Sequence, residues 1–378
     1  MKNLLFVVNV DWFFVSHRLP IAIEAVKAGY KVSVATTITD KKDEIEKHGI
    51  EVHSLKIDRG LFSIFEVIAL IFRLTVLFFK EKPDIVHLVT IKPVILGGIA
   101  ARLLNIKSIV YAISGMGFVY TAQGRIAVFR KSLVSFLYKL ALRTDGSQII
   151  FQNNYDLEML SRIKFLPESS VSMIKGSGVD LTRFRPNPSY RVKKPKVVMA
   201  ARLLKDKGVI EFVEAARILS AEMEAAAEFL LVGEVDLSNP ASLQKEEVEQ
   251  LQKESFIKCM GHREDMENIL QEAAIFVLPS YREGLPKVVL EASACGKPVI
   301  TTDVPGCRDA ITPAVTGLLV PPRDVGSLAL SIKYLLQNES KREEFGIAGR
   351  KQAVREFDLE LVIQKHLEIY ALLVRDAQ

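Results

Sequence analysis

Short apolar runs with the length of buried strands alternate with longer amphipathic runs along most of the chain. This alternation constrains the fold most, because parallel strands must be joined by crossovers, which are right-handed and usually helical. It predicts an α/β protein with mostly parallel sheets. In the first half the expected strands are 4–10, 31–35, 51–55, 84–88, 108–112 and 147–151, and the expected helices are 20–27, 61–80, 94–104 and 127–142.

The alternation is interrupted at 184–195, where three prolines and a basic cluster break both periodicities. It then resumes with expected strands at 196–201, 228–232, 256–260, 275–278, 299–302 and 317–320, and with helices at 208–219, 245–253, 265–271, 286–294, 325–337, 341–356 and 360–377. We therefore predict two doubly wound, Rossmann-like domains that face a ligand cleft. The first domain is expected at 1–185 and the second at 186–356. A final helix is expected at 357–378 and could cross back to the first domain.

The stretch 280–296 reads as the loop and helix of a strand–loop–helix–strand unit, with Pro286 in the first helical turn and Gly296 at the helix end. A helix N-terminus presents unpaired N–H groups that bind phosphate. Glu283 and Glu291 flank this expected anion site, and carboxylates accept hydrogen bonds from hydroxyls. A site that can hold polyols on either side of a phosphate indicates a nucleotide-sugar pocket.

Arg202 and Lys207 follow the first expected strand of the second domain. A guanidinium fork and an ammonium suit a diphosphate and would neutralise charge on a leaving phosphate. The alternative is that both are ordinary solvated charges at a helix start.

Together, these residues resemble glycosyltransferase family 4, the retaining transferases of the GT-B fold. The resemblance covers most of 196–356 and rests on Arg202…Lys207-Gly208, on Gly261-His-Arg-Glu-Asp265, and on the E-x7-E element from Glu283 to Glu291. It implies that Arg202, Lys207 and Glu283 are the catalytic residues, with the first two on the donor diphosphate and Glu283 on the transferred sugar. It further implies donor contacts by Gly284, Leu285 and Pro286, a ribose contact by Glu291, and a base-flanking turn with Gly261 and Arg263.

In that family the donor phosphate itself could deprotonate the acceptor, so the protein acts by positioning and electrostatic support. Glycosyl transfer and retention come from the resemblance alone, whereas the residues by themselves indicate phosphate and polyol chemistry. The chain has no D-x-D near a strand end and no histidine cluster, so we expect neither a metal nor another cofactor. Its three widely spaced cysteines fit a reducing cytosol.

Candidate acceptor residues lie in the first half. Ser16, His17 and Arg18, expected at a helix N-terminus, could bind an anionic diphosphate, or could simply cap a helix. His87, Thr90 and Lys92 close the fourth expected strand; for His87 a structural role is the alternative. Ser114 and Gly115 follow the fifth expected strand.

Two patterns in the first half resemble a subgroup of the family. They are the Ser-Gly-x-Gly-Phe motif at 114–118 and the His-Arg-x-Pro start at 17–20. That subgroup extends sugars linked to polyprenyl diphosphate. Many members of the family carry a histidine that contacts the donor sugar where this chain has Ser114.

Charge is unevenly distributed, with net +9 over 1–190 and −4 over 191–378, and no acidic residue lies between Asp84 and Asp145. The apolar stretch 61–79 could be a buried crossover, an interfacial helix or a spanning helix, although Glu66 and Arg73 near its middle disfavour spanning. The basic, amphipathic segment 125–143 favours an interfacial arrangement on anionic lipid. No interleaved aromatic residues or motifs indicate nucleic acid binding.

We therefore predict a glycosyltransferase on the cytoplasmic face of the cell membrane, peripherally bound to the anionic surface. Its expected donor is a nucleotide-sugar, preferably a UDP-N-acetylhexosamine, and its expected acceptor is a saccharide linked to a lipid diphosphate in surface-glycan assembly. The alternatives are a sugar-nucleotide epimerase on the same fold and a non-catalytic subunit that binds nucleotide-sugars. The sugar, base and linkage stay open.

Overall fold

The computed structural model describes residues 1–57, 64–115, 125–143, 145–187, 194–223, 227–236, 239 and 241–375, with only the backbone of 125–130. Four expected features lie partly outside these residues: the start of the helix at 61, the motif residues 116–118, the side chains at 125–130, and the linker residues 188–193. The chain divides into two compact units, Met1–Ser177 with Glu360–Gln378, and Gly178–Leu359. The expected boundary at 185–186 lies several residues later than this division.

The first unit contains a seven-stranded sheet in the order β3-β2-β1-β4-β5-β6-β7, in which every neighbouring pair is parallel. The strand order reverses between β1 and β4. The strands are β1 (Asn3–Val10), β2 (Lys31–Thr37), β3 (Glu51–Ser54), β4 (Ile85–Val89), β5 (Ile109–Ile113), β6 (Ser147–Phe151) and β7 (Val171–Met173).

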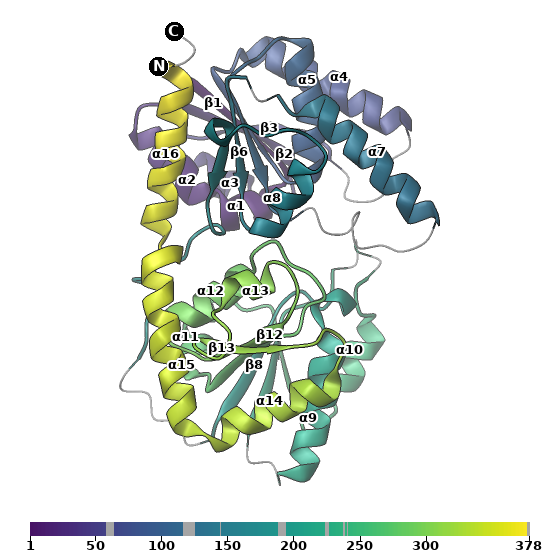
Figure 1. The fold of residues 1–378 in the computed structure, drawn as a ribbon, viewed down its shortest axis with the longest axis vertical. Coiled ribbons are helices and arrows are strands. Elements are labelled where there is room, and N and C mark those ends of the chain that lie inside the picture. Colours follow the sequence, from purple (N-terminus) through teal and green to yellow (C-terminus); the bar gives the residue numbers. More distant parts are fainter. Residues whose placement is uncertain are drawn as a thin grey trace. The chain divides into compact units, whose positions relative to one another are not determined.

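Helices cover both faces of this sheet (Figure 1). Side chains of α4, α5 and α7 pack into one apolar core, and those of α2, α3 and α16 into the other. The helices of the unit are α1 (Asp11–His17), α2 (Leu19–Lys27), α3 (Lys42–Glu46), α4 (Ile64–Glu81), α5 (Gly98–Leu103), α7 (Arg125–Ala141), α8 (Asn154–Ser161) and α16 (Leu359–Arg375), with a π-helical segment at Pro93–Gly97.

The second unit contains a six-stranded parallel sheet in the order β10-β9-β8-β11-β12-β13, which reverses between β8 and β11. Its strands are β8 (Lys196–Ala200), β9 (Glu228–Val232), β10 (Lys258–Gly261), β11 (Ile275–Leu278), β12 (Val299–Thr302) and β13 (Gly317–Val320). Its helices are α9 (Val209–Glu222), α10 (Lys245–Leu251), α11 (Met266–Glu272), α12 (Lys287–Ala294), α13 (Cys307–Ala310), α14 (Val325–Gln337) and α15 (Glu339–Gln352). The predicted fold class, two doubly wound parallel sheets, is confirmed.

Several short elements of the first unit were not among the expected ones: strand β7 and helices α1, α3 and α8. Strand β7 has only three residues, one of them Ser172, and is too short to give a periodic signal. The segment after β1, expected to be a loop, is helix α1. Asp11 lies in its first turn, where its carboxylate accepts N–H groups from Trp12, Thr39 and Lys41.

The segments at the two ends of the second unit run side by side. Val179 donates its N–H to the carbonyl of Phe357 at 2.8 Å, and Leu359 donates to the carbonyl of Val179 at 3.1 Å. Gly178 has φ +77°, and a Cβ there would lie 2.6 Å from the Cα of Leu359. Glycine is therefore required where these segments meet.

Helix α16 packs against the sheet of the first unit through residues spaced at helical intervals: Val362, His366, Ile369, Tyr370 and Leu373. The polar side chains of His366 and Tyr370 on α16 form a buried cluster with His87 on β4. The Nδ1 atom of His87 shares a 2.7 Å hydrogen bond with the hydroxyl of Tyr370, and the rings of His87 and His366 stack with centroids 5.7 Å apart. His87 thus has the structural role considered as its alternative. Arg18 is also buried, and its charge adds to the effect of burial in lowering the pKa of both histidines, that of His366 to about 3.

We expect acid to destabilise this cluster. A histidine whose folded pKa is lowered contributes its full stability above about pH 6.5, the unfolded value, and loses it as the pH falls toward the folded pKa. Lowering the pH from 7 to 5 should reduce the free energy of unfolding by about 2 kcal/mol for each buried histidine. Urea denaturation at the two pH values measures this loss.

Between pH 7 and 5 the free energy of unfolding of the variant His366→Asn should fall by about 2 kcal/mol less than that of the wild type. The exposed His262 offers a matched control, His262→Asn. An acid loss in His366→Asn equal to that of the wild type would contradict the assignment.

Candidate functional site

Two loops that carry predicted site residues leave neighbouring strands at the reversal point of the second sheet. Strands β8 and β11 are paired in register, with Val197 beside Ile275. The loop after β8 carries Arg202 and Lys207, and the loop after β11 carries Glu283. Ligands of doubly wound sheets bind at such reversal points, at the carboxyl ends of the strands.

Lys207 and Glu283 form an ion pair across these two loops. The ammonium lies 2.6 Å from Oε1 of Glu283, and the side chains are 19% and 13% exposed. The hydroxyl of Ser280 donates to the same carboxylate oxygen at 2.8 Å. A cation and an anion are therefore held together at a place where a phosphate could recruit the ammonium and a hydroxyl could bind the carboxylate.

Two glycines allow the backbone to close around this pair. A Cβ at Gly208, φ +75°, would lie 2.2 Å from the carbonyl oxygen of Pro279. A Cβ at Gly306, φ +81°, would lie 2.4 Å from the carbonyl oxygens of both Glu283 and Gly284. Sequence reasoning missed Gly306, although the Pro-Gly dipeptide at 305–306 is a turn signal.

The loop then enters α12 through two of the predicted donor-contact residues. Leu285 is buried in the core of the second unit, and Pro286 is the N-cap residue of α12, one position before the first turn in which it was expected. Leu285 thus anchors the loop that leads from Glu283 to the start of α12.

Arg202 binds the carboxylate of Asp236, which lies in the loop after the neighbouring strand β9. Its Nη1 atom lies 2.6 Å from Oδ2 of Asp236, whose backbone N–H donates to the hydroxyl of Ser242 at 3.0 Å. Asp236 was not predicted, because an aspartate after a strand is common and carries no motif. The structure thus gives Arg202 a carboxylate partner different from that of Lys207.

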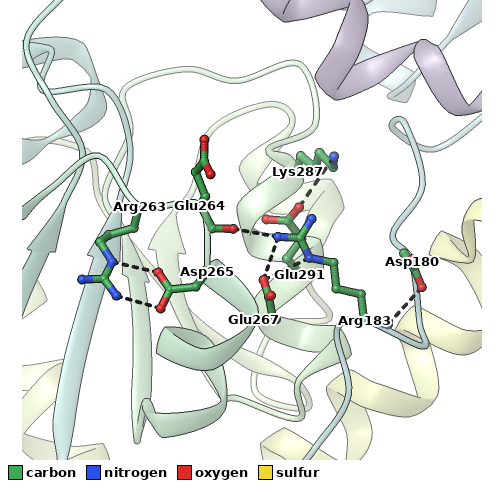
Figure 2. A network of polar contacts seen from close by, with 8 residues as sticks. All are labelled: Asp180, Arg183, Arg263, Glu264, Asp265, Glu267, Lys287 and Glu291. Atoms are coloured by element: carbon green, nitrogen blue, oxygen red, sulfur yellow. Dashed lines mark hydrogen bonds and ion pairs between the residues drawn. The ribbon is translucent and has the colours of Figure 1, made fainter. Parts of the chain in front are cut away.

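Glu291 lies in a separate charged network on the same unit (Figure 2). The carboxylate is almost fully buried on α12, 3.7 Å from the ammonium of Lys287. Arg183 donates to Glu267 at 2.8 and 3.0 Å and to the carbonyl of Glu264 at 2.7 Å. Burial raises the pKa of Glu291, while Lys287 and Arg183 act against this increase. Arg183 lies far from Glu291 in the sequence, and no motif pointed to it.

Arg263 and Gly261, predicted near the nucleotide base, lie at the end of β10. Gly261 has φ +66°. Arg263 forms a two-bond pair with Asp265, at 2.8 and 2.7 Å, which Figure 2 shows beside the Glu291 network. The predicted turn therefore carries an arginine whose charge is balanced within the turn.

The three predicted acceptor residues at the start of the chain are arranged differently from the expectation. Ser16 and His17 end α1 instead of beginning a helix, because the aromatic run 12–14 is itself helical. Their side chains contact each other, and the ring of His17 stacks on Phe13 at 4.1 Å. Arg18 is the N-cap residue of α2 and is 2% exposed, with its Nη1 donating to the carbonyl of His17 and to the hydroxyl of Ser177. The expected helix N-terminal position of Ser16 and His17 is wrong.

Lys92, Ser114 and Gly115 follow strands β4 and β5, which are neighbours in the first sheet, with Val89 beside Ala112. Thr90 has φ +74°, a strained conformation for a β-branched residue and one that occurs at functional sites. Gly115, with φ +115°, adopts a conformation that glycine permits. The structure therefore brings these predicted residues to one edge of the sheet.

Helices α4 and α7 expose large apolar side chains. On α4 only Leu70, Leu74 and Phe78 are buried. Among the side chains that the structure describes, the large exposed apolar ones of α4, α5 and α7 are Ile64, Phe65, Ile68, Phe72, Phe79, Leu103, Leu133, Phe136 and Leu140. Within the described part of the chain, no helix has both the length and the apolarity needed to span a bilayer.

One group of described residues in the first unit has the composition of a metal site. Glu51 and His53 on β3 and Glu81 at the end of α4 bring ligand atoms within 4.8 Å of one another. The Nε2 atom of His53 lies 3.8 and 3.7 Å from the two carboxylates, so a protonated His53 would pair with both. The expectation of no metal stays a prediction.

Two family models match this chain. Residues 182–352 match the model for glycosyl transferases group 1, and residues 3–154 match the glycosyl transferase 4-like model.

Curated relatives are similar over most of their length. The chain is 29% identical to the N,N'-diacetylbacillosaminyl-diphospho-undecaprenol alpha-1,3-N-acetylgalactosaminyltransferase of Campylobacter jejuni, covering 92% of this chain and 96% of that protein. It is also 29% identical to the UDP-Gal:alpha-D-GlcNAc-diphosphoundecaprenol alpha-1,3-galactosyltransferase of Escherichia coli, covering 76% and 78%.

Solved structures share the fold. Anabaena HepE in complex with UDP and glucose has a TM-score of 0.77 at 18% identity, covering 98% of this chain and all of that chain. Sucrose-phosphate synthase from Thermosynechococcus elongatus has a TM-score of 0.78 at 21% identity, covering 99% of each. The expected GT-B fold is confirmed.

The Lys207–Glu283 pair should contribute measurably to stability. Lys207→Ala leaves a mostly buried carboxylate without its cation and should lower the free energy of unfolding by about 1–3 kcal/mol. The double variant with Glu283→Ala should cost less than the sum of the single changes, because the unpaired charge is then gone. Urea denaturation measures each value.

The exposed pair Lys333–Glu222, 2.8 Å apart, gives a matched control. Lys333→Ala should cost about 0–1 kcal/mol. Equal losses for Lys207→Ala and Lys333→Ala would show that burial adds nothing to the first pair.

Proposed function

We propose that this glycosyltransferase, whose residues 182–352 match the model for glycosyl transferases group 1, moves an N-acetylhexosamine from a UDP-linked donor to a saccharide on a polyprenyl diphosphate. The observation that carries the donor half is the Lys207–Glu283 pair at the reversal point of the second sheet. The acceptor half is supported by the two relatives named above, both of which act on undecaprenol-diphosphate-linked sugars according to their names. UDP is supported by the name of the Escherichia coli relative.

In this proposal Lys207 and Arg202 bind the donor diphosphate, and Glu283 binds the sugar. When the donor enters, the ammonium of Lys207 turns from the carboxylate toward the β-phosphate, and the carboxylate accepts a sugar hydroxyl. Glu291, buried on α12, accepts hydrogen bonds from the ribose. Gly284, Leu285 and the start of α12 supply backbone N–H groups near the phosphate, and Pro286, which has no N–H, ends the loop. Gly261 and Arg263 lie on the turn that flanks the base.

The proposed reaction retains the anomeric configuration. The bond between the anomeric carbon and the diphosphate oxygen breaks with its electron pair leaving on UDP. An acceptor hydroxyl forms the new bond on the same face and passes its proton to the leaving phosphate. Lys207 and Arg202 stabilise the charge that develops on this phosphate, so the proposal requires neither a protein nucleophile nor a metal.

We assign the acceptor to the first unit. Lys92, Ser114 and Gly115 lie at one edge of its sheet beside the strained Thr90, and the basic half of the chain suits a diphosphate. Ser16, His17 and Arg18 support this assignment less directly, since Arg18 is enclosed and its burial lowers its pKa to about 10.

A donor and acceptor screen tests this function. UDP-GalNAc, UDP-GlcNAc, UDP-Gal and a GDP-sugar would each be combined with undecaprenyl diphosphate carrying an N-acetylhexosamine, and nucleotide release and product anomer would be measured, with and without EDTA. We expect release with one UDP-sugar only when the acceptor is present, an α-linked product, and no loss in EDTA.

Glu283→Gln should lower kcat at least about a hundredfold. Glu222→Gln, on the surface of the same unit, should not change it. No release of nucleotide from any pair, or full activity of Glu283→Gln, would refute the proposal.

We further propose that the enzyme binds the cytoplasmic face of the membrane through the exposed apolar side chains of α4, α5 and α7. Exposed cations border them: Arg73, Lys80, Arg102, Lys107, Lys131 and Lys139, with Glu66 as an exposed acid on α4. Apolar side chains flanked by lysine and arginine are typical of helices that lie in the interface of anionic bilayers. A lipid-linked acceptor would be presented at that surface.

Vesicle binding tests this surface. Phe65→Ser with Phe72→Ser should weaken binding to phosphatidylglycerol vesicles by at least about tenfold, because two large side chains no longer enter the bilayer. Leu330, which is 68% exposed on α14 of the second unit, gives the control Leu330→Ser. Equal weakening by the control, or equal binding to neutral vesicles, would contradict this assignment.

A further inference from the structure

Tyr281 connects the two loops that carry Lys207 and Glu283. Its backbone N–H donates to the carbonyl of Asp206 at 2.8 Å, next to Lys207. Its hydroxyl contacts Oε1 of Glu211 at 2.5 Å. Glu211 belongs to the first turn of α9, immediately after the Lys207 loop. One side chain of the Glu283 loop is therefore tied at two points to the Lys207 loop and its helix.

Glu211 is enclosed in a way that makes the phenol its principal partner. The residue is 8% exposed, and its Oε2 atom, within the described residues, is buried without a hydrogen-bond partner. A buried carboxylate is costly unless it accepts hydrogen bonds. The positive end of the α9 dipole and the hydroxyl of Tyr281 are the stabilising groups at this position.

A third residue fixes the aromatic ring. The guanidinium of Arg323 lies 4.6 Å from the ring centroid of Tyr281, a cation–π distance. Arg323 has φ +64°, so its backbone adopts a conformation unfavourable for a residue with a Cβ. Burial, together with Glu211, raises the pKa of Tyr281 to about 12, against the effect of Arg323. The phenol is therefore protonated near neutral pH and donates to the carboxylate.

The proposed reaction requires a link between the loops other than the Lys207–Glu283 ion pair. That pair must open when the donor binds, since the ammonium then faces phosphate and the carboxylate faces sugar. Without another connection the two loops could separate just when their spacing determines the alignment of phosphate and sugar. The contacts of Tyr281 do not involve either charged group, so they persist while the ion pair opens.

We propose that Tyr281 and Glu211 are positioning residues that keep the spacing between Lys207 and Glu283 fixed during glycosyl transfer. This inference rests on the proposed function, because it needs a donor that separates the ion pair. It assigns roles to two residues that do not touch substrate and act through the loops that do.

Steady-state kinetics of Tyr281→Phe tests the assignment. Loss of the hydroxyl should lower kcat about ten- to a hundredfold, as small misplacements of reacting groups do. The KM for the donor and the affinity for UDP should stay within about twofold, because the nucleoside is bound by other elements. Tyr334→Phe, on the exposed face of α14, is the matched control and should leave kcat unchanged.

Variants of Glu211 separate positioning from general stability. Glu211→Gln keeps an oxygen that accepts the phenol's hydrogen bond and should retain most of kcat. Glu211→Ala should fall as far as Tyr281→Phe, and the double variant no further, because both changes remove one contact. Glu214→Ala, one turn along α9, is the control. Full kcat in Tyr281→Phe, or additive losses in the double variant, would overturn the inference.

Hydrogen exchange distinguishes this inference from the proposed function. In the ligand-free protein, Tyr281→Phe should speed exchange of the amide of residue 281 relative to Tyr334→Phe. If the wild type transfers no sugar, the proposed function fails, and with it the role in catalysis, while exchange still reports the contact. If transfer occurs but Tyr281→Phe changes neither exchange nor kcat, the inference alone fails.

Discussion

The close approach of two loops at the reversal point of the second sheet determines how the proposed donor site is built. Strands β8 and β11 lie side by side, and each ends in a loop that must turn sharply before a helix begins. The backbone of Gly208 passes so near Pro279 that no side chain fits. This proximity brings a lysine and a glutamate into contact in a mostly buried place, where a charge without a partner would be costly.

Other features of the second unit follow from that proximity. Gly306 packs against the backbone of the Glu283 loop, and Leu285 of that loop is buried in the core. Tyr281 of the same loop forms a hydrogen bond with Glu211 on α9. The Glu291 network is separate and is stabilised by lysine and arginine side chains around a buried carboxylate. In the proposed function, the loops around Lys207 and Glu283 bind phosphate and sugar, and the separate Glu291 network binds the ribose.

The sheets and the loop and helix around Glu283 could be predicted from the sequence because both leave local signals. Apolar runs marked twelve of the strands, and the motif from Glu283 to Glu291 identified one loop and one helix. Partners that are distant in sequence left no such signal: Asp236 for Arg202, Glu211 for Tyr281, and Arg183 beside Glu291. Helix α1 was missed because its aromatic run has no clear period, and β7 because three residues are too few. The apolar stretch that forms most of α4 left three possibilities open, since composition does not say which face a neighbour covers.

Helix α16 has a consequence for the order in which this protein can fold. The first unit takes its last helix from residues beyond 359, whereas the second unit is one continuous segment. During synthesis the second unit can therefore be completed while the first still exposes the apolar face that Ile369, Tyr370 and Leu373 will cover. The half of the enzyme assigned to the lipid acceptor is the half that matures last. Until α16 docks, a nascent chain exposes apolar surface that chaperones would need to cover.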